Sequence, residues 1–474
     1  METVKAGRTK SYLLLAALLL GFLGMLAAFG PALYNDSDQY IRMHIHREPL
    51  YPLFLWIIRG ICGAGWLYAA GVIQNVLAAV SIWFFAEYLY RKFSLLLWEE
   101  ILVVLLGIIP YLFTRYFSVL RIFIPNSVMS EALCLPLFLF FITGCFDMFT
   151  AGKKQFWKAA VKAGILALVL SLTRSQMMAA ILVWMVVLVV RTLRGKAEFF
   201  KKMLWLCGIV GIVALAFLLR LFLVKCYNLA FNGHFINNTY GGVNTLTNIL
   251  YVSDREDGEN IKDEEAREFF YLMYDMADER EAAYRYAGSS FTEKAEHIEK
   301  WHDTIKFEII EDLYYQTYKK TVVDDYIIIN LRADETSMKI IKGILPKCFG
   351  RWLTNYLILA AYGMIRSIAV VHPVMNWIAG LFYLLSMGMA VFMIQKNRRK
   401  GQKTDNAVWF YLLTMLFILG NVCTVSITIM TLSRYMIYGF SLFYTACFLL
   451  LITAFRTWQK ERAEKGLQSW AIRI

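Results

Sequence analysis

Long apolar runs recur along most of this chain, and they restrict its fold more than any other feature of the sequence. A helix needs about 20 apolar residues to cross a bilayer, and runs of that order include residues 11–33, 127–148 and 407–429. Of the 474 residues, 59% are hydrophobic and only 18% are charged, which is unusual for a soluble domain. We therefore predict an all-α integral membrane protein in a lipid bilayer, with about ten transmembrane helices.

The hydropathy pattern places the spans along the chain. We expect them at residues 11–33, 66–89, 99–117, 127–148, 157–172, 175–191, 203–224, 374–395, 407–429 and 435–455. The first run has the position of a signal peptide. It lacks a small-residue cleavage motif and further spans follow it, so we interpret it as a retained helix.

Basic side chains indicate the orientation of the spans. The net charge of +13 would also suit a nucleic-acid partner. However, the lysines and arginines gather in short loops between spans, for example in residues 153–162 and 396–403. This distribution is the positive-inside pattern of membrane proteins. We therefore predict that the N- and C-termini are cytoplasmic, and that no nucleic acid is bound.

One long polar segment interrupts the spans and divides the chain. The predicted parts are an N-terminal transmembrane module (1–224) with a first outer loop (34–65), an extracytoplasmic helical domain (225–350), an interfacial helix (351–373), C-terminal transmembrane helices (374–455) and a cytoplasmic tail (456–474). In the domain, residues 291–321 have apolar side chains at helical spacing. Residues 232–248 have the composition of an ordered loop, Asp334 is a candidate helix cap, and Pro346 is expected to end a helix.

Residues 349–371 are long enough to span a membrane, but we do not count them as a span. They contain Arg351 and Arg366, and Pro373 follows them. A span here would also move the basic loop at 396–403 to the outside, against the positive-inside rule. We therefore interpret this stretch as an amphipathic helix in the outer interface.

The first outer loop begins with YNDSDQYIRMHIHREPLYPLF, at residues 34–54, directly after an apolar run. Asp36 and Asp38 lie just past the end of the first predicted helix. Polar residues at such a place often do no more than face water. A carboxylate held there could also act on a substrate that resides in the membrane.

The continuation of this loop predicts a short helix on the membrane surface. Pro49 and Pro52 stop a long helix from passing through an apolar stretch that is too short to span. Tyr51 and Trp56 are residue types that anchor helices at the level of the lipid headgroups. A loop that contains such a helix has more structure than a simple connection between two spans requires.

Histidine and cysteine side chains are common metal ligands, and this chain contains both. His44 and His46 have a spacing that could bind a divalent ion, but no further dedicated ligand is evident, so we expect polar surface histidines, with no metal and no cofactor. No Cys-x-x-Cys pair occurs among the eight cysteines. Cys226 and Cys348 flank the polar segment, and whether they form a disulfide is left open by the sequence.

Several short motifs resemble the GT-C glycosyltransferases, which are polytopic membrane enzymes. Asp36 with Tyr40 four residues later, followed by REPLYPLF, is similar to the first outer loop of this family. NSVMSEALCLPLFLF, LSLTRSQ around Arg174, and LSRYMIYGFSLFY around Arg434 follow in the family's order. The resemblance covers most of the chain except about 225–345. It is closest to the protein mannosyltransferase and aminoarabinose transferase type.

The resemblance implies sugar transfer from a polyprenyl-phosphate donor to an acceptor on the extracytoplasmic face, with inversion. Such transfer needs a base for the acceptor hydroxyl and cations for the leaving phosphate. The family spacing to Tyr40 favours Asp36 as the base, with Asp38 second. Family members usually have two adjacent acidic residues here, whereas this chain has Asp36-Ser37-Asp38, so the choice between the two aspartates stays open.

Lone arginines at the outer ends of spans are the candidate phosphate ligands. They are Arg115, Arg121, Arg174 and Arg434. Contact with lipid headgroups would explain any one of them, whereas convergence on a phosphate would use the paired hydrogen bonds of guanidinium. Arg174 and Arg434, beside Tyr435, match family positions. Glu131, in the MSEAL match, would orient an arginine, contact the acceptor or form a structural ion pair.

Other functions fit parts of the pattern. A transporter or flippase for a lipid-linked glycan would carry ionisable residues at mid-membrane and often inverted repeats, and no repeat is visible. A polymerase or ligase would use a diphosphate-linked glycan. A non-catalytic scaffold would make Asp36 and Arg174 dispensable. For the enzyme, the acceptor would be a glycan, lipid or protein, and the resemblance implies a bacterial plasma membrane.

Overall fold

The computed structural model describes residues 2–117, 121–195 and 198–471. Residues 1, 118–120, 196–197 and 472–474, which belong to the predicted N-terminal module and tail, lie outside the described residues. Within the described ranges every element is helical and no β-strand is present. One isolated parallel bridge joins Ala32 to Ser127.

Ten helices in the described part of the chain are long and apolar enough to cross a membrane. They contain α1 (Glu2–Phe29), α4 (Trp66–Phe93), α5 (Leu97–Tyr116), α6 (Glu131–Thr150), α7 (Lys153–Thr173), α8 (Met178–Arg194), α9 (Phe199–Asn232), α15 (Pro373–Arg399), α16 (Asn406–Thr428) and α17 (Ser433–Ala471). Each predicted span coincides with one of them. The chain is therefore a multi-pass helical membrane protein, as the apolar runs predicted.

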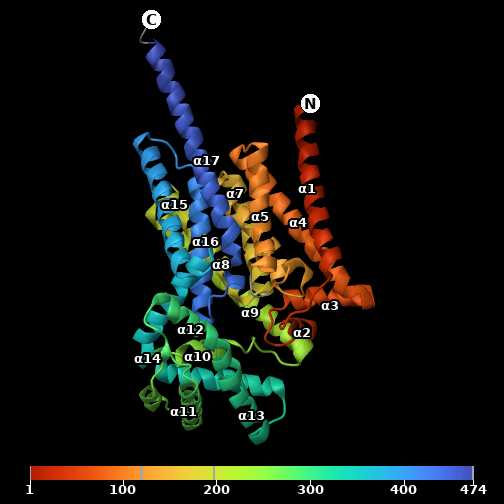
Figure 1. Cartoon of the computed structure of the whole chain (residues 1–474), viewed down its shortest axis with the longest axis vertical. Helices are drawn as coiled ribbons and strands as arrows, with labels where there is room; N and C mark the ends of the chain where they lie inside the picture. Colours follow the sequence, from red (N-terminus) through yellow and green to blue (C-terminus); the bar gives the residue numbers. More distant parts are fainter. Residues whose placement is uncertain (1, 118–120, 196–197, 472–474) are drawn as a thin grey trace.

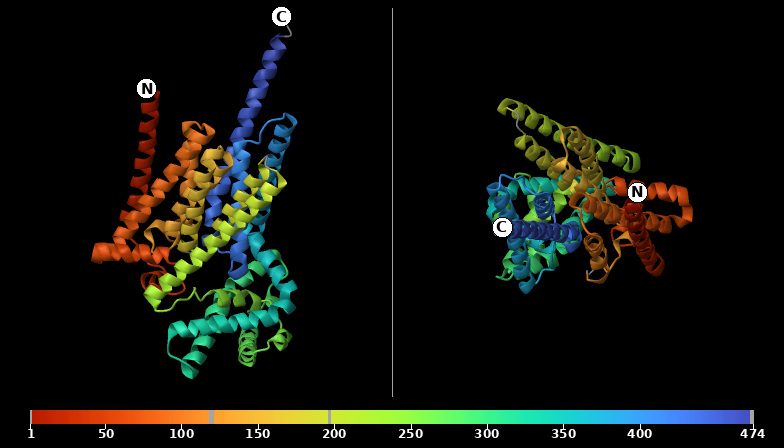
Figure 2. Two further views of the ribbon diagram at one scale, coloured as in Figure 1. Left: turned by 180° about the vertical axis from the view of Figure 1, so that it is seen from behind. Right: turned by 90° about the horizontal axis from the view of Figure 1, so that it is seen from above.

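The helices form a bundle with α6 near its centre. In the apolar window of α6, 78% of the residues are buried inside the protein, against 22% for α9. The side chains of α9 therefore face mostly outward, as expected for a helix in contact with lipid. Both termini lie at one end of the bundle, and helices α10 to α13 lie at the opposite end (Figure 1; Figure 2 shows the view from behind and from above). We call this opposite end the domain end.

The polar segment folds as a helical domain with its own core. Its helices are α10 (Gly241–Leu250), α11 (Glu264–Glu279), α12 (Phe291–Asp303), α13 (Asp312–Thr321) and α14 (Tyr326–Arg366), with a π-helical segment, η6 (Thr304–Glu311), joining α12 to α13. Leu246, Phe270, Ile309 and Ile340 are fully buried there. The predicted helix at 291–321 is confirmed. The predicted loop at 232–248 is wrong in its second half, because α10 begins at Gly241.

Helix α14 corrects two predictions. It runs for 41 residues, so Pro346 lies inside it and does not end it, and no separate interfacial helix begins at residue 351. A proline inside a helix removes one backbone hydrogen bond and bends the helix, which packing can compensate. Arg351 pairs with Asp254 at 2.9 Å, and Arg366 pairs with Glu299. These ion pairs join the predicted interfacial stretch to the domain.

Two short helices follow α1 in the first loop: α2 (Ser37–Ile41) and α3 (Leu50–Cys62). Pro49 precedes α3 and Pro52 lies in its first turn, where a proline is tolerated. Figure 1 shows α3 projecting sideways from the bundle at the domain end. Trp56 is 55% exposed, but Tyr51 is fully buried and donates a hydrogen bond to Gln74 at 2.8 Å. Tyr51 therefore does not anchor α3 by contact with lipid headgroups, contrary to the prediction.

The cysteines do not form the disulfide that the sequence left open. Cys226, in α9, and Cys348, in α14, are both free thiols. Cys348 is buried among the apolar residues of the domain core, so it acts there as a small apolar side chain.

Candidate functional site

The site begins where two loops at the domain end are joined. Ala32 accepts a backbone hydrogen bond from Val128 at 3.0 Å and donates one to Asn126 at 2.8 Å. The Asn126 side chain donates to the carbonyls of Met25 and Gly30, each at 3.1 Å, which satisfies the exposed carbonyl end of α1. These bonds hold the loop after α1 against the loop before α6, so residues far apart in sequence share one site.

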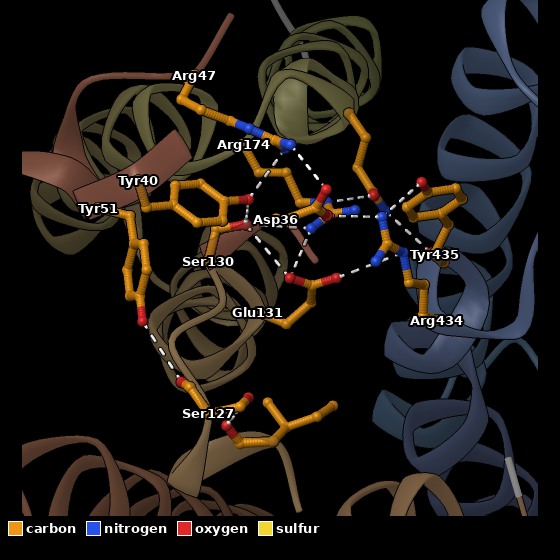
Figure 3. Close-up of polar contacts among 12 residues, drawn as sticks. Asp36, Tyr40, Arg47, Tyr51, Ser127, Ser130, Glu131, Arg174, Arg434 and Tyr435 are labelled. Carbon is orange, nitrogen blue, oxygen red and sulfur yellow. Dashed lines mark hydrogen bonds and ion pairs between the residues drawn. The ribbon is translucent and has the colours of Figure 1, made fainter. Parts of the chain in front are cut away.

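Asp36 lies in this joined region, between two arginines. It precedes α2, and the hydroxyl of its neighbour Ser37 donates to the Val128 carbonyl at 2.9 Å. One carboxylate oxygen of Asp36 pairs with Arg47 at 2.8 Å, and the other pairs with Arg434 of α17 at 3.0 Å (Figure 3). Asp36 is thus fixed between the first loop and the last helix.

Glu131 and Arg174 form a second ion pair beside the first. Glu131 begins α6 and is 1% exposed, and its carboxylate pairs with Arg174, in the turn between α7 and α8, at 2.7 Å. Arg174 also donates to the Ser130 hydroxyl at 3.1 Å, and the Tyr40 hydroxyl lies 3.0 Å from the same oxygen. Figure 3 shows Ser130 in the middle of these contacts.

Helix α17 connects the two ion pairs. The guanidinium carbons of Arg174 and Arg434 each lie 4.9 Å from the centre of the Tyr435 ring. Gln176 accepts a hydrogen bond from Arg174 at 2.6 Å and donates to the Tyr435 carbonyl at 2.9 Å. The two arginines therefore flank one aromatic ring, and their side chains are oriented by neighbours from different helices.

The electrostatics of the cluster favour an anionic ligand. Three guanidinium groups (Arg47, Arg174, Arg434) face two carboxylates (Asp36, Glu131). The Arg434 Nε and Glu131 Oε1 atoms are buried without a hydrogen-bond partner, and they lie 4.0 Å apart. Unpaired buried polar atoms are costly, and they often mark the place of a ligand.

Asp36 is ionised in this setting. Burial raises the pKa of its carboxyl, but the positive charges of Arg47, Arg434 and Arg174 outweigh that effect, so the pKa lies below its ordinary value. A carboxylate with a lowered pKa is a weak base. Its proton affinity would rise if one of the arginines were neutralised by another anion.

Three residues singled out from the sequence lie outside this cluster. Asp38 is 63% exposed and pairs with Arg42 at 2.8 Å, one helical turn away. Arg115 is half-buried, lies over the Phe29 ring, and donates to the Arg121 carbonyl at 2.8 Å. The structure therefore brings together Asp36, Tyr40, Glu131, Arg174, Arg434 and Tyr435, but not Asp38, Arg115 or Arg121.

Sequence reasoning missed several members of the cluster. Arg47 follows Asp36 by 11 residues, and it contacts both Asp36 and the Tyr40 hydroxyl. It could have been noticed because it opens the REPLYPLF match. Ser130 and Gln176 lie inside quoted motifs, beside Glu131 and Arg174. Neutral polar residues inside a motif carry no charge signal, so their roles became visible only from their contacts.

The two histidines of the first loop pack against the domain. The His46 ring lies 3.9 Å from the Tyr240 ring, and its Nδ1 is 3.1 Å from the Thr239 hydroxyl. Burial lowers the pKa of His46 well below its ordinary value and that of His44 to about 4, so both are neutral near pH 7. Among the described residues, no group of three or more His, Cys, Asp or Glu side chains is arranged to hold a metal ion.

Comparison with protein-family models, curated proteins and solved structures gave no match for this chain.

Proposed function

We propose that this protein is a membrane glycosyltransferase of the GT-C type. It would move a sugar from a polyprenyl-phosphate donor to a hydroxyl group of a glycan, lipid or protein acceptor at the domain end. The observation that carries this proposal is the position of Asp36, which lies between Arg47 and Arg434 with Arg174 in the same cluster. A carboxylate beside several guanidinium groups supplies the base and the phosphate ligands that such a transfer needs.

The donor phosphate is assigned to Arg174 and Arg434. Both belong to the membrane bundle, in the α7–α8 turn and at the start of α17, so a phosphate on a membrane-embedded lipid can reach them. Guanidinium binds phosphate through parallel hydrogen bonds, and Arg434 Nε is a buried donor with no partner. Glu131 and Gln176 hold the Arg174 side chain in place for this role.

Donor binding would also activate the base. Arg434 pairs with Asp36 and weakens the affinity of that carboxylate for a proton. A phosphate that takes over Arg434 would neutralise that positive charge, and the pKa of Asp36 would rise. The base would then gain strength only when the donor is present.

The transfer itself is a single displacement. The acceptor oxygen attacks the anomeric carbon while its proton passes to a carboxylate oxygen of Asp36. The bond between the anomeric carbon and the phosphate oxygen breaks, and the leaving polyprenyl phosphate takes the electron pair. Arg174 and Arg434 stabilise the charge on that oxygen. Attack from the face opposite the leaving group inverts the anomeric centre.

The Asp36→Asn variant tests the proposal. Asparagine keeps the size of the side chain but cannot accept the proton. We expect membranes with the wild-type protein to transfer sugar from radiolabelled polyprenyl-phosphate sugars, and the variant to lose about 10²–10⁴-fold of that rate, which is the usual contribution of a general base. Asp38→Asn is the matched control, because Asp38 is exposed and pairs only with Arg42, so its rate should be unchanged.

Other results would contradict the assignment. Equal transfer by wild type and Asp36→Asn would exclude Asp36 as the base, and a loss confined to Asp38→Asn would move that role to Asp38. No transfer from any donor by well-expressed wild-type protein would count against an enzyme. A lipid-flipping assay would then test the transport of a lipid-linked glycan.

A further inference from the structure

A lysine of the helical domain lies close to the arginine cluster. Lys306 belongs to the π-helical segment η6. π-helical turns are rare and occur frequently at functional sites. Only 7% of the Lys306 side chain is exposed, although lysine is among the residues least often buried.

Lys306 is buried as a residue, and its ammonium forms no ion pair with any of the residues that the structure describes. Its nitrogen lies 3.8 Å from the centre of the Tyr240 ring, and the Tyr240 hydroxyl donates to Glu311 at 3.5 Å. One carboxylate oxygen of Glu311, Oε1, is buried without a hydrogen-bond partner. A cation on a buried side chain that has no ion pair leaves an interaction to be made by an anionic ligand.

Several charged and titratable groups surround Lys306. Four charged groups influence the pKa of Lys306: Glu311, Arg47, Asp303 and Asp36. The positive charge of Lys306 in turn lowers the pKa values of His46 and His302. Burial and, to a smaller extent, the positive charge of Arg47 lower the pKa of Lys306 to about 8, against the opposing effect of the nearby carboxylates. Lys306 is therefore mostly protonated near pH 7 and loses its charge as the pH rises through about 8.

The cations near Asp36 come from two parts of the protein. Arg434 and Arg174 belong to the bundle, whereas Lys306 belongs to the domain. Arg47 forms an ion pair with Asp36, and the charges of both residues influence the pKa of Lys306. Asp36 is therefore influenced by cations from both the bundle and the domain. A membrane-embedded donor occupies the bundle side, which leaves the domain side to the acceptor.

We propose that Lys306 binds an anionic group of the acceptor, so that the acceptor is an acidic glycan or polymer carrying carboxylates or phosphates. The inference rests on the proposed function, because it takes Asp36 as the group that contacts the acceptor hydroxyl. Tyr240 supports the ammonium from one side, and Arg47 adds a second positive charge. An acidic group bound here directs a neighbouring hydroxyl of the same chain toward Asp36.

A purely structural role for Lys306 makes a different prediction. In that case its contact with Tyr240 and its attraction to Glu311 would be all that it contributes. Replacement by methionine, which has a similar length but no charge, would then alter stability without any effect that depends on the charge of an added ligand.

Equilibrium binding to the purified full-length protein in lipid nanodiscs separates these roles. The probes are a trimer of galacturonate, a trimer of glycerol phosphate and neutral maltotriose. We expect the wild type to bind at least one acidic trimer and not maltotriose. Lys306→Met should bind that trimer about 10- to 100-fold more weakly, which corresponds to the loss of one charge-assisted hydrogen bond. Lys319→Met is the matched control, because Lys319 is a 45%-exposed lysine of the same domain.

The pH dependence adds a readout that a structural lysine would not produce. Because Lys306 must be protonated to bind an anion, wild-type affinity should be highest well below pH 8 and fall as the pH rises through about 8. Lys306→Arg keeps its charge at every accessible pH, so it should bind the acidic trimer without this decline.

Each outcome bears on the proposal without requiring sugar transfer. Weaker binding confined to Lys306→Met supports it even if no donor is ever used, and the acidic trimer that binds more tightly identifies carboxylate or phosphate as the recognised group. Equal binding of maltotriose, no binding of either acidic trimer, or equal affinities of wild type and Lys306→Met would refute it.

Discussion

At the scale of single residues, a substitution at Arg174 distinguishes the effect of positive charge from the effect of hydrogen-bond geometry. It pairs with Glu131 and donates to Ser130 and Gln176, so its guanidinium is held by three partners. Lysine at this position keeps the charge but not the forked set of donors. We expect Arg174→Lys to reduce transfer by about 10- to 100-fold, because a charge-assisted hydrogen bond to the donor phosphate is lost.

Arg115→Lys is the control for this change. Arg115 is half-buried at the end of α5, outside the cluster, and bonds a backbone carbonyl, so transfer by this variant should equal that of the wild type. Rates measured at several donor concentrations would show whether Arg174→Lys mainly weakens donor binding or slows the reaction. An unchanged rate at all concentrations would remove Arg174 from the donor site.

The residues of the site were predictable to different degrees. Asp36, Glu131, Arg174 and Arg434 could be selected because a charge at the end of an apolar run is conspicuous. Lys306 could not, because it lies in an amphipathic stretch full of charges. Its burial results from the packing of η6 against other helices of the domain, and it lies over the ring of Tyr240, 66 residues earlier in the chain. No local pattern predicts such a contact.

At the scale of elements, the joint between α10 and α14 depends on one glycine. The Asp334 side chain, from the N-terminal part of α14, accepts hydrogen bonds from the backbone N–H of Gly242 at 2.5 Å and of Val243 at 3.3 Å. It thus satisfies the first N–H groups of a different helix. A Cβ at Gly242 would lie 2.6 Å from the Asp334 carbonyl oxygen, whereas a Cβ at Gly241 would meet nothing within 4 Å.

We therefore expect Gly242→Ala to destabilise this joint by about 1–3 kcal/mol, which is the usual cost of overpacking. Gly241→Ala should be neutral or slightly stabilising, because alanine favours a helix. Hydrogen exchange measures the effect locally: the amides of α10 should exchange faster in the first variant and not in the second. Equal exchange in both variants would show that the joint tolerates the extra methyl group.

The same joint explains why sequence reasoning misjudged these elements. Asp334 was interpreted as the cap of its own helix, but it lies inside α14 and caps α10. Two adjacent glycines suggested a loop at 241–242, whereas there they allow close packing of two helices. Pro346 suggested a helix end, but the contacts of Arg351 and Arg366 with the domain hold α14 together beyond it.

At the scale of the whole molecule, the arrangement predicts which segments share a side of the membrane. Figure 1 shows the two termini and the loop between α15 and α16 at one end, with α10 to α13 at the other. Epitope tags at Gly401 and at the C-terminus should therefore be accessible from the same side, and a tag at Val323, between α13 and α14, from the opposite side. Antibody binding to intact and permeabilised cells measures this directly.

The positive-inside rule assigns the Gly401 side to the cytoplasm. A tag at Gly401 that reacted in intact cells would reverse this assignment. Hydropathy sufficed to predict the ten spans, because each must bury its backbone hydrogen bonds inside an apolar helix. It could not place the domain against the first loop, because that contact depends on surface shape and charge.

The Asp36 ion pairs have a consequence for selectivity in a membrane. Ordinary phospholipids also carry phosphates, and they outnumber any rare glycolipid around the bundle. With Asp36 bound to both Arg47 and Arg434, a headgroup must first displace an internal competitor that is tethered to the same chain. Only a lipid that makes further contacts, for example through its sugar, can displace Asp36 from these arginines. The Asp36 carboxylate would therefore exclude the abundant phospholipids from the site and admit the proposed lipid-linked donor.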